Sequence, residues 1–401
     1  MIPFAPPRVD KETIDAVTEV LKSGWITTGP KTKLFEKKIG EYCNVPAVLC
    51  LNSATAGLEL ALRWYGVGEG DEVILPAYTY AATANVVMHC GAKPVLVDVN
   101  NDDFNISLQS IEQKITAKTK VIMPVDFGGL PCDYKGIMTI AANSKSKFVP
   151  ANKKQEALGR ILVLSDAAHS FGASYNGKKT GTLADISVFS FHAVKNLTTA
   201  EGGAMTLNLP APFNNEEIYK ELCIKALHGQ NKDALAKTQK GNWRYDIVEA
   251  GYKCNMTDIF AAMGLVELNR YDSSTLKQRK HVVEQYQKAL SACKWAELPV
   301  FIDDKRESSY HLYPLRIKAV DEAKRDAIIQ KIFDKDVSVN VHFIPLPMLS
   351  FYKNMGYKIS EYPVAYANFS CEISLPVYFD LTDEQVQAVV NAVIKSVEEI
   401  L

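Results

Sequence analysis

The feature that most constrains the fold of this chain is a series of short apolar runs, each followed by turn residues. Five such runs occupy residues 72–76, 93–99, 120–125, 160–168 and 185–191. Amphipathic helical stretches lie between several of them, for example Thr55–Tyr65 and Tyr80–Cys90. Strands buried on both faces that alternate with helices predict an α/β domain around a mainly parallel sheet.

The pattern changes near residue 258. Residues 259–292 form one long helical pattern with apolar side chains three and four positions apart. Beyond it we expect strands at 309–317, 337–345 and 371–377 and helices at 321–333 and 383–400. The sequence therefore predicts a large α/β domain over 1–257 and a small α+β domain over 258–401, joined by the long helix.

Charge and cysteine content exclude several classes of protein. The 401 residues include 45 Lys and Arg against 46 Asp and Glu, which argues against a dedicated nucleic-acid or membrane-surface binder. No apolar run approaches the ~18 residues that a membrane span needs. The eight cysteines form no C-x-x-C pair, so we expect reduced thiols and no bound metal. Residues 1–12 do not resemble a signal peptide, and we expect a cytoplasmic protein.

The first candidate for ligand binding is the segment SATAG at residues 53–57, which opens a predicted helix. Ser53 is a favourable N-cap, and the free amides at the start of a helix attract anions. The segment predicts either a simple helix cap or a phosphate site around Ala54 and Thr55.

The second candidate is Asp166, at the carboxyl end of a predicted buried strand, where α/β proteins usually bind ligands. A carboxylate in this place pairs with a protonated ring nitrogen, which keeps it ionised in spite of burial. Alternatively, Asp166 caps the next helix. His169 lies one helical turn further on and either braces the same ring or is an ordinary buried histidine.

The third candidate is Lys195, which follows the apolar run 185–191 and precedes the glycine pair Gly202–Gly203. An amine in a partly desolvated place loses pKa and becomes a usable nucleophile for carbonyl carbons. A phosphate site, a carboxylate for a ring nitrogen and a lysine at a strand end, in this order, together indicate pyridoxal phosphate.

These segments resemble the sugar aminotransferases of the DegT/DnrJ/EryC1/StrS family, enzymes that use pyridoxal phosphate to aminate nucleotide-linked keto sugars. The resemblance extends from residue 23 to residue 386 and is carried by SATAG, PAYTYAATAN, DAAHSFG, FSFHAVKN, AEGGAM and GYKCNMTDIFAAMGL in family order. Within the family, SGWITTGPK, SATAG, FHAVKN and GYKCN are most similar to the branch that aminates a UDP-4-keto-pentose in lipid A modification.

The resemblance implies a role for each matching residue. Lys195 would form the Schiff base with the cofactor and move the proton between substrate and cofactor carbons. Asp166 would hold the pyridine nitrogen protonated, His169 would support the ring, and Tyr80 would stack on it. The phosphate would be held by Ala54, Thr55 and Ser190, together with Asn255 of the partner chain. The sugar nucleotide would contact Trp25, His228, Arg244 and His342.

The resemblance also implies the fold and the partners. The fold would be of the aspartate-aminotransferase type (fold type I), in a homodimer whose chains complete each other's sites. Glutamate would leave pyridoxamine phosphate and 2-oxoglutarate, and the amino group would pass to a keto sugar nucleotide for lipid A or surface polysaccharide. The alternatives are a sugar dehydratase on the same scaffold, which typically carries His at the lysine position, and a non-catalytic regulatory paralogue.

Three segments depart from the family pattern. In the block that here reads GYKCN (251–255), many family members have Asn and Arg. Asp126 stands where a histidine is frequent, and residues 144–160 look like an insertion with five basic side chains. The basic segment predicts either a solvated surface or a rim that attracts a phosphorylated substrate.

Overall fold

A seven-stranded sheet forms the centre of the computed structural model, which describes residues 1–232 and 244–401. The strand order is β1-β9-β8-β5-β4-β2-β3, and β9 runs opposite to the other six strands, which are mutually parallel. The strands are β1 (Ala47–Leu51), β2 (Glu72–Pro76), β3 (Lys93–Val97), β4 (Thr119–Ile122), β5 (Leu162–Asp166), β8 (Ile186–Ser190) and β9 (Gly203–Leu207). The prediction of an α/β fold with a mainly parallel sheet is therefore confirmed.

Helices cover both faces of this sheet. One face packs on α3 (Ala54–Tyr65), α4 (Ala81–His89) and α8 (Asn215–Ala226) through residues such as Leu58, Val121 and Val188. The other face packs on α2 (Pro30–Cys43), α5 (Leu108–Lys114), α6 (Tyr134–Asn143) and α10 (Asp258–Arg270). Alternate residues of each strand point to opposite faces, so apolar side chains are needed on both.

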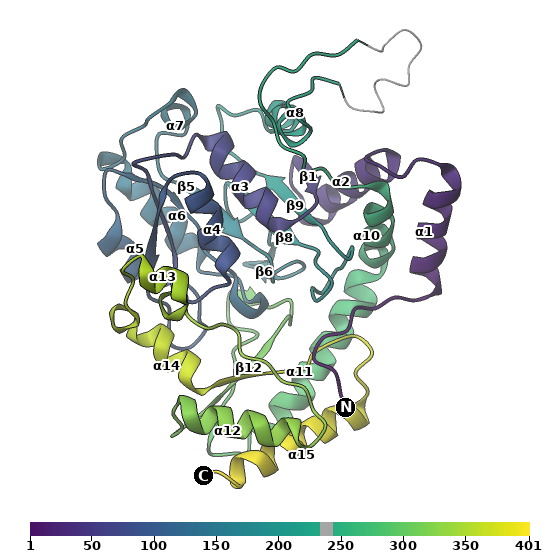
Figure 1. Cartoon of the computed structure of the whole chain (residues 1–401), viewed down its shortest axis with the longest axis vertical. Coiled ribbons are helices and arrows are strands. Elements are labelled where there is room, and N and C mark those ends of the chain that lie inside the picture. Colours follow the sequence, from purple (N-terminus) through teal and green to yellow (C-terminus); the bar gives the residue numbers. More distant parts are fainter. Residues whose placement is uncertain (233–243) are drawn as a thin grey trace.

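A second layer of structure follows α10. A π-helical turn (Tyr271–Thr275) joins α10 to α11 (Leu276–Leu290). The expected long helix is therefore present as two α-helices that run on through this turn. A small antiparallel sheet of β10 (Ala296–Glu297), β12 (Tyr313–Ile317) and β13 (Glu372–Leu375) packs on α11, α12 (Glu322–Phe333) and α15 (Asp383–Glu398). Figure 1 shows these elements gathered below the central sheet, with both termini beside them.

The remaining elements connect the two layers or cover their surface. They are α1 (Lys11–Ser23), α7 (Lys153–Leu158), α13 (Ser350–Asn354), α14 (Pro363–Cys371), β6 (Ser174–Tyr175), β7 (Lys178–Lys179) and β11 (Arg306–Glu307). Because α10 packs on α1 and α2, and Phe369 of α14 joins the core of the large sheet, contacts cross residue 258. The division into domains at that residue stays a prediction.

The prediction of a strand at 337–345 is wrong. This segment forms only single bridges, between Ile2 and Val337 and between Asn340 and Ser374. After Asn340 the backbone leaves the small sheet, because His342 and Phe343 turn into a cavity instead of continuing the ladder.

The basic segment 144–160 lies before β5, at the opposite end of that strand from Asp166. Lys154 pairs with Glu221, and Arg160 makes a buried bidentate pair with Asp185 at 2.8 and 2.6 Å. These contacts favour a structural surface over a substrate rim.

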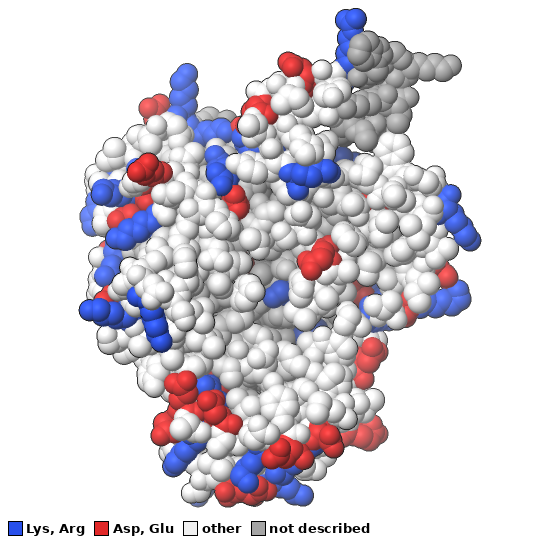
Figure 2. All heavy atoms as spheres, in the orientation of Figure 1, with Lys and Arg blue, Asp and Glu red and all other residues white. Residues whose placement is uncertain are grey.

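The surface agrees with the nearly balanced charge of the sequence. Figure 2 shows basic and acidic side chains mixed around the edge of one face, while the middle of that face is mostly uncharged. Among the described residues, no helix is both long enough and apolar enough to cross a membrane.

Candidate active site

A cavity of about 400 Å³ lies where several strands of the large sheet end. Ser53 and Ala54 follow β1, Thr79 and Tyr80 follow β2, and Asp166 ends β5. The carboxyl ends of parallel strands meet at one edge of a sheet, which is where α/β proteins bind ligands. The sheet therefore brings together side chains that are far apart in the sequence.

One end of the cavity is the amino terminus of α3. Ser53 caps this helix by accepting a hydrogen bond from the amide of Ala56 at 3.1 Å. The amides of Ala54 and Thr55 belong to the first turn and have no acceptor within the helix. Ser190, at the end of β8, also lines this part of the cavity. Free amides and a hydroxyl at a helix start form a site for a phosphate.

A glycine allows α3 to approach the sheet this closely. A Cβ atom at Gly203 would lie 2.6 Å from the backbone nitrogen of Ala54, which is closer than real Cβ atoms come. Gly203 is paired with Ser190 across the β8–β9 ladder. The absence of a side chain at Gly203 therefore keeps the start of α3 beside Ser190.

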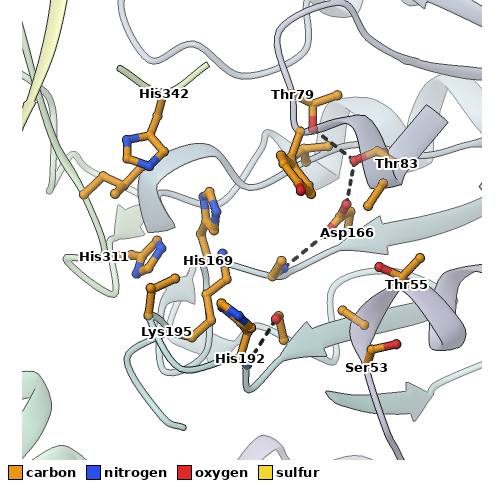
Figure 3. Close-up of a pocket in the computed structure, with 18 of the residues that line it drawn as sticks. Ser53, Thr55, Thr79, Thr83, Asp166, His169, His192, Lys195, His311 and His342 are labelled. Atoms are coloured by element: carbon orange, nitrogen blue, oxygen red, sulfur yellow. Dashed lines mark hydrogen bonds between the residues drawn. The ribbon is translucent and has the colours of Figure 1, made fainter. Parts of the chain in front are cut away.

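Asp166 is buried and lies in a chain of hydroxyl groups (Figure 3). Its Oδ2 accepts a hydrogen bond from Thr83 Oγ1 at 2.8 Å, and the Thr83 hydroxyl lies 3.0 Å from that of Thr79. Its Oδ1 accepts from the amide of Ala168 at 3.3 Å. Burial raises the pKa of Asp166, while the bond from Thr83 and the charge of Lys195 oppose that rise. A carboxylate held in this way is suited to pair with a cationic ring nitrogen.

Lys195 follows β8 in a tight turn, in which its amide donates to the carbonyl of His192 at 2.9 Å. Burial lowers the pKa of the Lys195 amine to about 8, and the negative charge of Asp166 opposes that fall. Figure 3 shows Lys195 in the same cavity wall as His169 and His311. At neutral pH this amine is more often unprotonated than an exposed lysine, so it is a better nucleophile.

Four histidines line the cavity, and three of them, His169, His311 and His342, are buried. His169 Nδ1 accepts a hydrogen bond from the amide of Gly128 at 3.3 Å, and its ring centroid lies 4.4 Å from that of His311. His311 Nδ1 lies 2.8 Å from Oδ1 of Asn196. Burial and nearby positive charge, including that of Lys195, lower the pKa of His169, His311 and His342. All three are therefore neutral at physiological pH.

The structure brings together nine of the side chains predicted from the sequence or its resemblance. These are Ser53, Ala54, Thr55, Tyr80, Asp166, His169, Ser190, Lys195 and His342. Tyr80 is 66% exposed, with its ring centroid 6.0 Å from that of Phe343. Their roles toward a ligand stay predictions.

Four predicted residues do not line the cavity within this chain. Trp25 Nε1 donates to the carbonyl of Thr28 at 3.2 Å, and Asn255 Nδ2 donates to Thr28 Oγ1 at 2.5 Å. His228 and Arg244 are exposed. Asn255 was expected to act in the partner's site, so its place in its own chain does not test that role.

Sequence reasoning missed Thr83 and His311. Thr83 lies in the first turn of α4, four residues after Thr79, and the two hydroxyls are 3.0 Å apart. His311 comes from the segment before β12, and nothing in the sequence near it indicates contact with Lys195.

Asp126, which stands where the family often has a histidine, is buried below the cavity. It accepts hydrogen bonds from Ser170 Oγ at 2.6 Å, Tyr134 OH at 2.8 Å and the amide of Cys132 at 2.9 Å. Burial raises the pKa of Asp126 to about 6. Asp126 does not line the cavity, but its bond from Ser170 ties it to the residue that follows His169.

These residues fit pyridoxal phosphate. The first-turn amides of α3 match its phosphate, the buried carboxylate of Asp166 matches its ring nitrogen, and the amine of Lys195 matches its aldehyde. A seven-stranded sheet with these groups at its edge defines a pyridoxal-phosphate enzyme of fold type I.

Comparison with known proteins identifies the family. Residues 7–394 match the model of the DegT/DnrJ/EryC1/StrS aminotransferase family, and the chain belongs to this family of pyridoxal-phosphate-dependent sugar aminotransferases. The expected family and cofactor are therefore confirmed.

Three relatives illustrate the similarity. Spr1654 of Streptococcus pneumoniae, designated a sugar aminotransferase and solved in a PMP form, is 46% identical, with a TM-score of 0.97 and 100% of each chain covered. The spore coat polysaccharide biosynthesis protein SpsC of Bacillus subtilis is 36% identical over 98% of this chain and 96% of its own. Helicobacter pylori PseC, an aminotransferase involved in pseudoaminic acid biosynthesis, is 27% identical, with a TM-score of 0.86 and 99% of each chain covered.

Proposed function

We propose that this protein moves an amino group from glutamate to a keto sugar nucleotide, with a UDP-linked 4-keto sugar as the acceptor. The observation that carries the proposal is the placement of Lys195, Asp166 and the start of α3 around one cavity. The names of SpsC and PseC support a role in making surface sugars. We place the two substrates in the same cavity in turn, because a single lysine serves both half-reactions.

Pyridoxal phosphate, when bound, supplies an electron sink and carries the amino group from one substrate to the other. The first-turn amides of α3, with the hydroxyls of Thr55 and Ser190, would hold its phosphate. Tyr80 would stack on the ring and His169 would support it.

Asp166 holds a proton on the ring nitrogen through its charge. The hydroxyl of Thr83 and the amide of Ala168 orient the carboxylate, so that its free lone pairs face the cavity. An ionised carboxylate in a buried place needs such donors, because burial alone favours its protonated form.

Lys195 acts as the base and then as the acid. Its Nζ removes a proton from the carbon that bears the amino group of glutamate and returns a proton to the sugar carbon in the second half-reaction. A pKa of about 8 suits both tasks near neutral pH, because the amine is then present in both protonation states.

The active form in this proposal is a homodimer. Asn255 of one chain completes the phosphate site of the other, and Trp25, His228, Arg244 and His342 contact the sugar nucleotide. Asn255 and Trp25 both contact Thr28, so a shift of this loop at a dimer interface would move the two residues together.

The test is a screen of keto sugar nucleotides with glutamate, read by mass spectrometry. An amino sugar nucleotide formed together with 2-oxoglutarate supports the proposal. Loss of water from the sugar without net amine transfer would instead identify a dehydratase. Lys195→Ala should abolish turnover and the visible absorbance of the holoenzyme. If the wild-type protein shows neither, it is a non-catalytic paralogue.

A further inference from the structure

A buried hydrogen-bond chain runs from the core of the small sheet to the cavity. Glu372 and Ser374 are two residues apart on β13, so their side chains point to the same face. Ser374 Oγ lies 2.5 Å from Glu372 Oε1 and 2.9 Å from His342 Nδ1. The side chains of Glu372 and Ser374 are fully buried, whereas His342 lines the cavity. The chain therefore connects a buried acid to a nitrogen of a cavity histidine.

The backbone holds His342 against this chain. The amide of His342 donates to Glu372 Oε2 at 3.0 Å, and Asn340 and Ser374 exchange two backbone hydrogen bonds at 3.2 and 2.8 Å. Tyr78 OH donates to the carbonyl of His342 at 2.7 Å. The ring of Phe4 stacks on that of His342, with centroids 5.5 Å apart. The imidazole is thus fixed in place, and its Nε2 is the nitrogen not engaged by Ser374.

The proton on Glu372 decides the direction of the whole chain. When Glu372 is ionised, the single hydrogen of Ser374 points to Oε1, so Ser374 Oγ accepts from Nδ1–H and Nε2 is a bare acceptor. When Oε1 is protonated, it donates to Ser374, Ser374 donates to Nδ1, and the imidazole proton sits on Nε2. A neutral imidazole has one donor and one acceptor nitrogen, and the partner of one decides the role of the other.

We propose that Glu372 and Ser374 are positioning residues that determine whether Nε2 of His342 offers the cavity a hydrogen-bond donor or an acceptor. The coupling of Glu372 and Ser374 to His342 does not depend on the proposed function. Only the identity of the substrate group that Nε2 contacts rests on it. In the protonated chain, Nε2–H binds an oxygen that carries no hydrogen, such as the keto oxygen or a phosphate oxygen of the sugar nucleotide.

Several charged groups act on this chain. Arg325 of α12 donates to the backbone carbonyl of Glu372, and Arg316 of β12 lies opposite Glu372 in the ladder and pairs with Glu297. The charge of Lys195 acts on His342 from across the cavity, whose other buried histidines, His169 and His311, are neutral. Burial raises the pKa of Glu372 to about 8, against the charge of Arg325. The donor form therefore predominates at neutral pH, and the acceptor form above about pH 8.

The decisive measurement is the tautomer of His342 in the holoenzyme, read from the ¹⁵N shifts of labelled histidine. The signal is assigned by its loss in His342→Gln. We expect the wild type to carry the proton on Nε2 at about pH 6 and on Nδ1 at about pH 10, two units on either side of the transition. Glu372→Gln should stay in the Nε2–H form at both values, because its amide donates to Ser374 as the protonated acid does. Ser374→Ala should lose the coupling, and Ser374→Thr should restore it.

The same variants test the effect on substrate. Ser374→Ala should raise the KM for the keto sugar nucleotide about tenfold, because that is the contribution of one hydrogen bond. The rate of the half-reaction with glutamate should stay within about twofold of the wild type. Ser396→Ala is the matched control, because Ser396 of α15 is also a fully buried serine, but its hydroxyl makes no hydrogen bond.

The proposal is overturned if His342 keeps one tautomer across this pH range in the wild type. It is equally overturned if Ser374→Ala leaves the wild-type transition intact. Neither readout needs a substrate, so a failure here is distinct from a failure of the proposed transamination.

Discussion

Thr83 Oγ1 lies 2.8 Å from Oδ2 of Asp166, so that a hydroxyl of α4 donates to the carboxylate at the end of β5. The contact joins α4 and β5, which are far apart in the sequence. It gives the buried carboxylate a hydrogen-bond donor without adding a charge. The carboxylate keeps free lone pairs toward the cavity. Thr83 thereby helps the acid to stay ionised where burial alone would protonate it.

Replacement of Thr83 by Val should therefore lower kcat/KM about tenfold to a hundredfold. Valine keeps the shape of the side chain but removes the donor, and a hydrogen bond to a charged group contributes about 1.5–3 kcal/mol. Steady-state kinetics measure the loss. Thr83→Ser should recover most of the activity, and a Val variant that turns over as fast as the wild type would contradict the role of this hydroxyl.

The pKa of Lys195 predicts how fast the protein without cofactor captures pyridoxal phosphate. Only the neutral amine attacks an aldehyde, and burial lowers the pKa of this amine to about 8. The capture rate should rise about tenfold between about pH 7 and pH 9 and then level off. Stopped-flow absorbance measures the rate. A rate that still rises tenfold per unit above pH 9 would show an ordinary lysine.

The close approach of α3 to β9 predicts that Gly203→Ala weakens cofactor binding. The new Cβ would lie 2.6 Å from the nitrogen of Ala54 and would push the first turn of α3 away from Ser190. We expect the Kd for pyridoxal phosphate to rise at least about tenfold, as for the loss of one good hydrogen bond to a charged group. Fluorescence titration of the protein without cofactor measures it.

Gly68→Ala is the control for this variant. A Cβ at Gly68 would meet only the carbonyl of Cys90, at an ordinary 3.9 Å. Its Kd should equal that of the wild type. Equal Kd values for both alanine variants would mean that the start of α3 does not hold the phosphate.

The parts of the fold and site that the sequence predicts share one physical origin. Asp166 ends a predicted strand and Ala54 opens a predicted helix, so local patterns indicate both positions, and the carboxyl ends of parallel strands meet at one edge of the sheet. His311 could not be found in this way, because its position depends on how the segment before β12 packs against Asn196. The strands β1 and β9 were both missed. They pair with each other in antiparallel register although they lie far apart in the sequence, and local sequence patterns do not show such a pairing.

The buried pair of Arg160 and Asp185 predicts a structural role for the basic segment 144–160. Asp185 is 1% exposed, accepts two bonds from Arg160 and one from the amide of Val163, and lies at the start of β8. Arg160→Met leaves this carboxylate buried without its cation. Breaking such a pair on one side costs about 3–5 kcal/mol, so chemical denaturation should show a loss of that size in the free energy of unfolding.

Lys154→Met is the matched control from the same segment. Its partner Glu221 is partly exposed, and an ion pair in contact with water contributes about 1 kcal/mol or less. Neither variant should change the KM for a sugar nucleotide, because both cations lie at the end of the sheet away from the cavity. A rise in KM for Lys154→Met without loss of stability would instead support the basic rim, since only an electrostatic contribution to substrate binding would then remain to explain it.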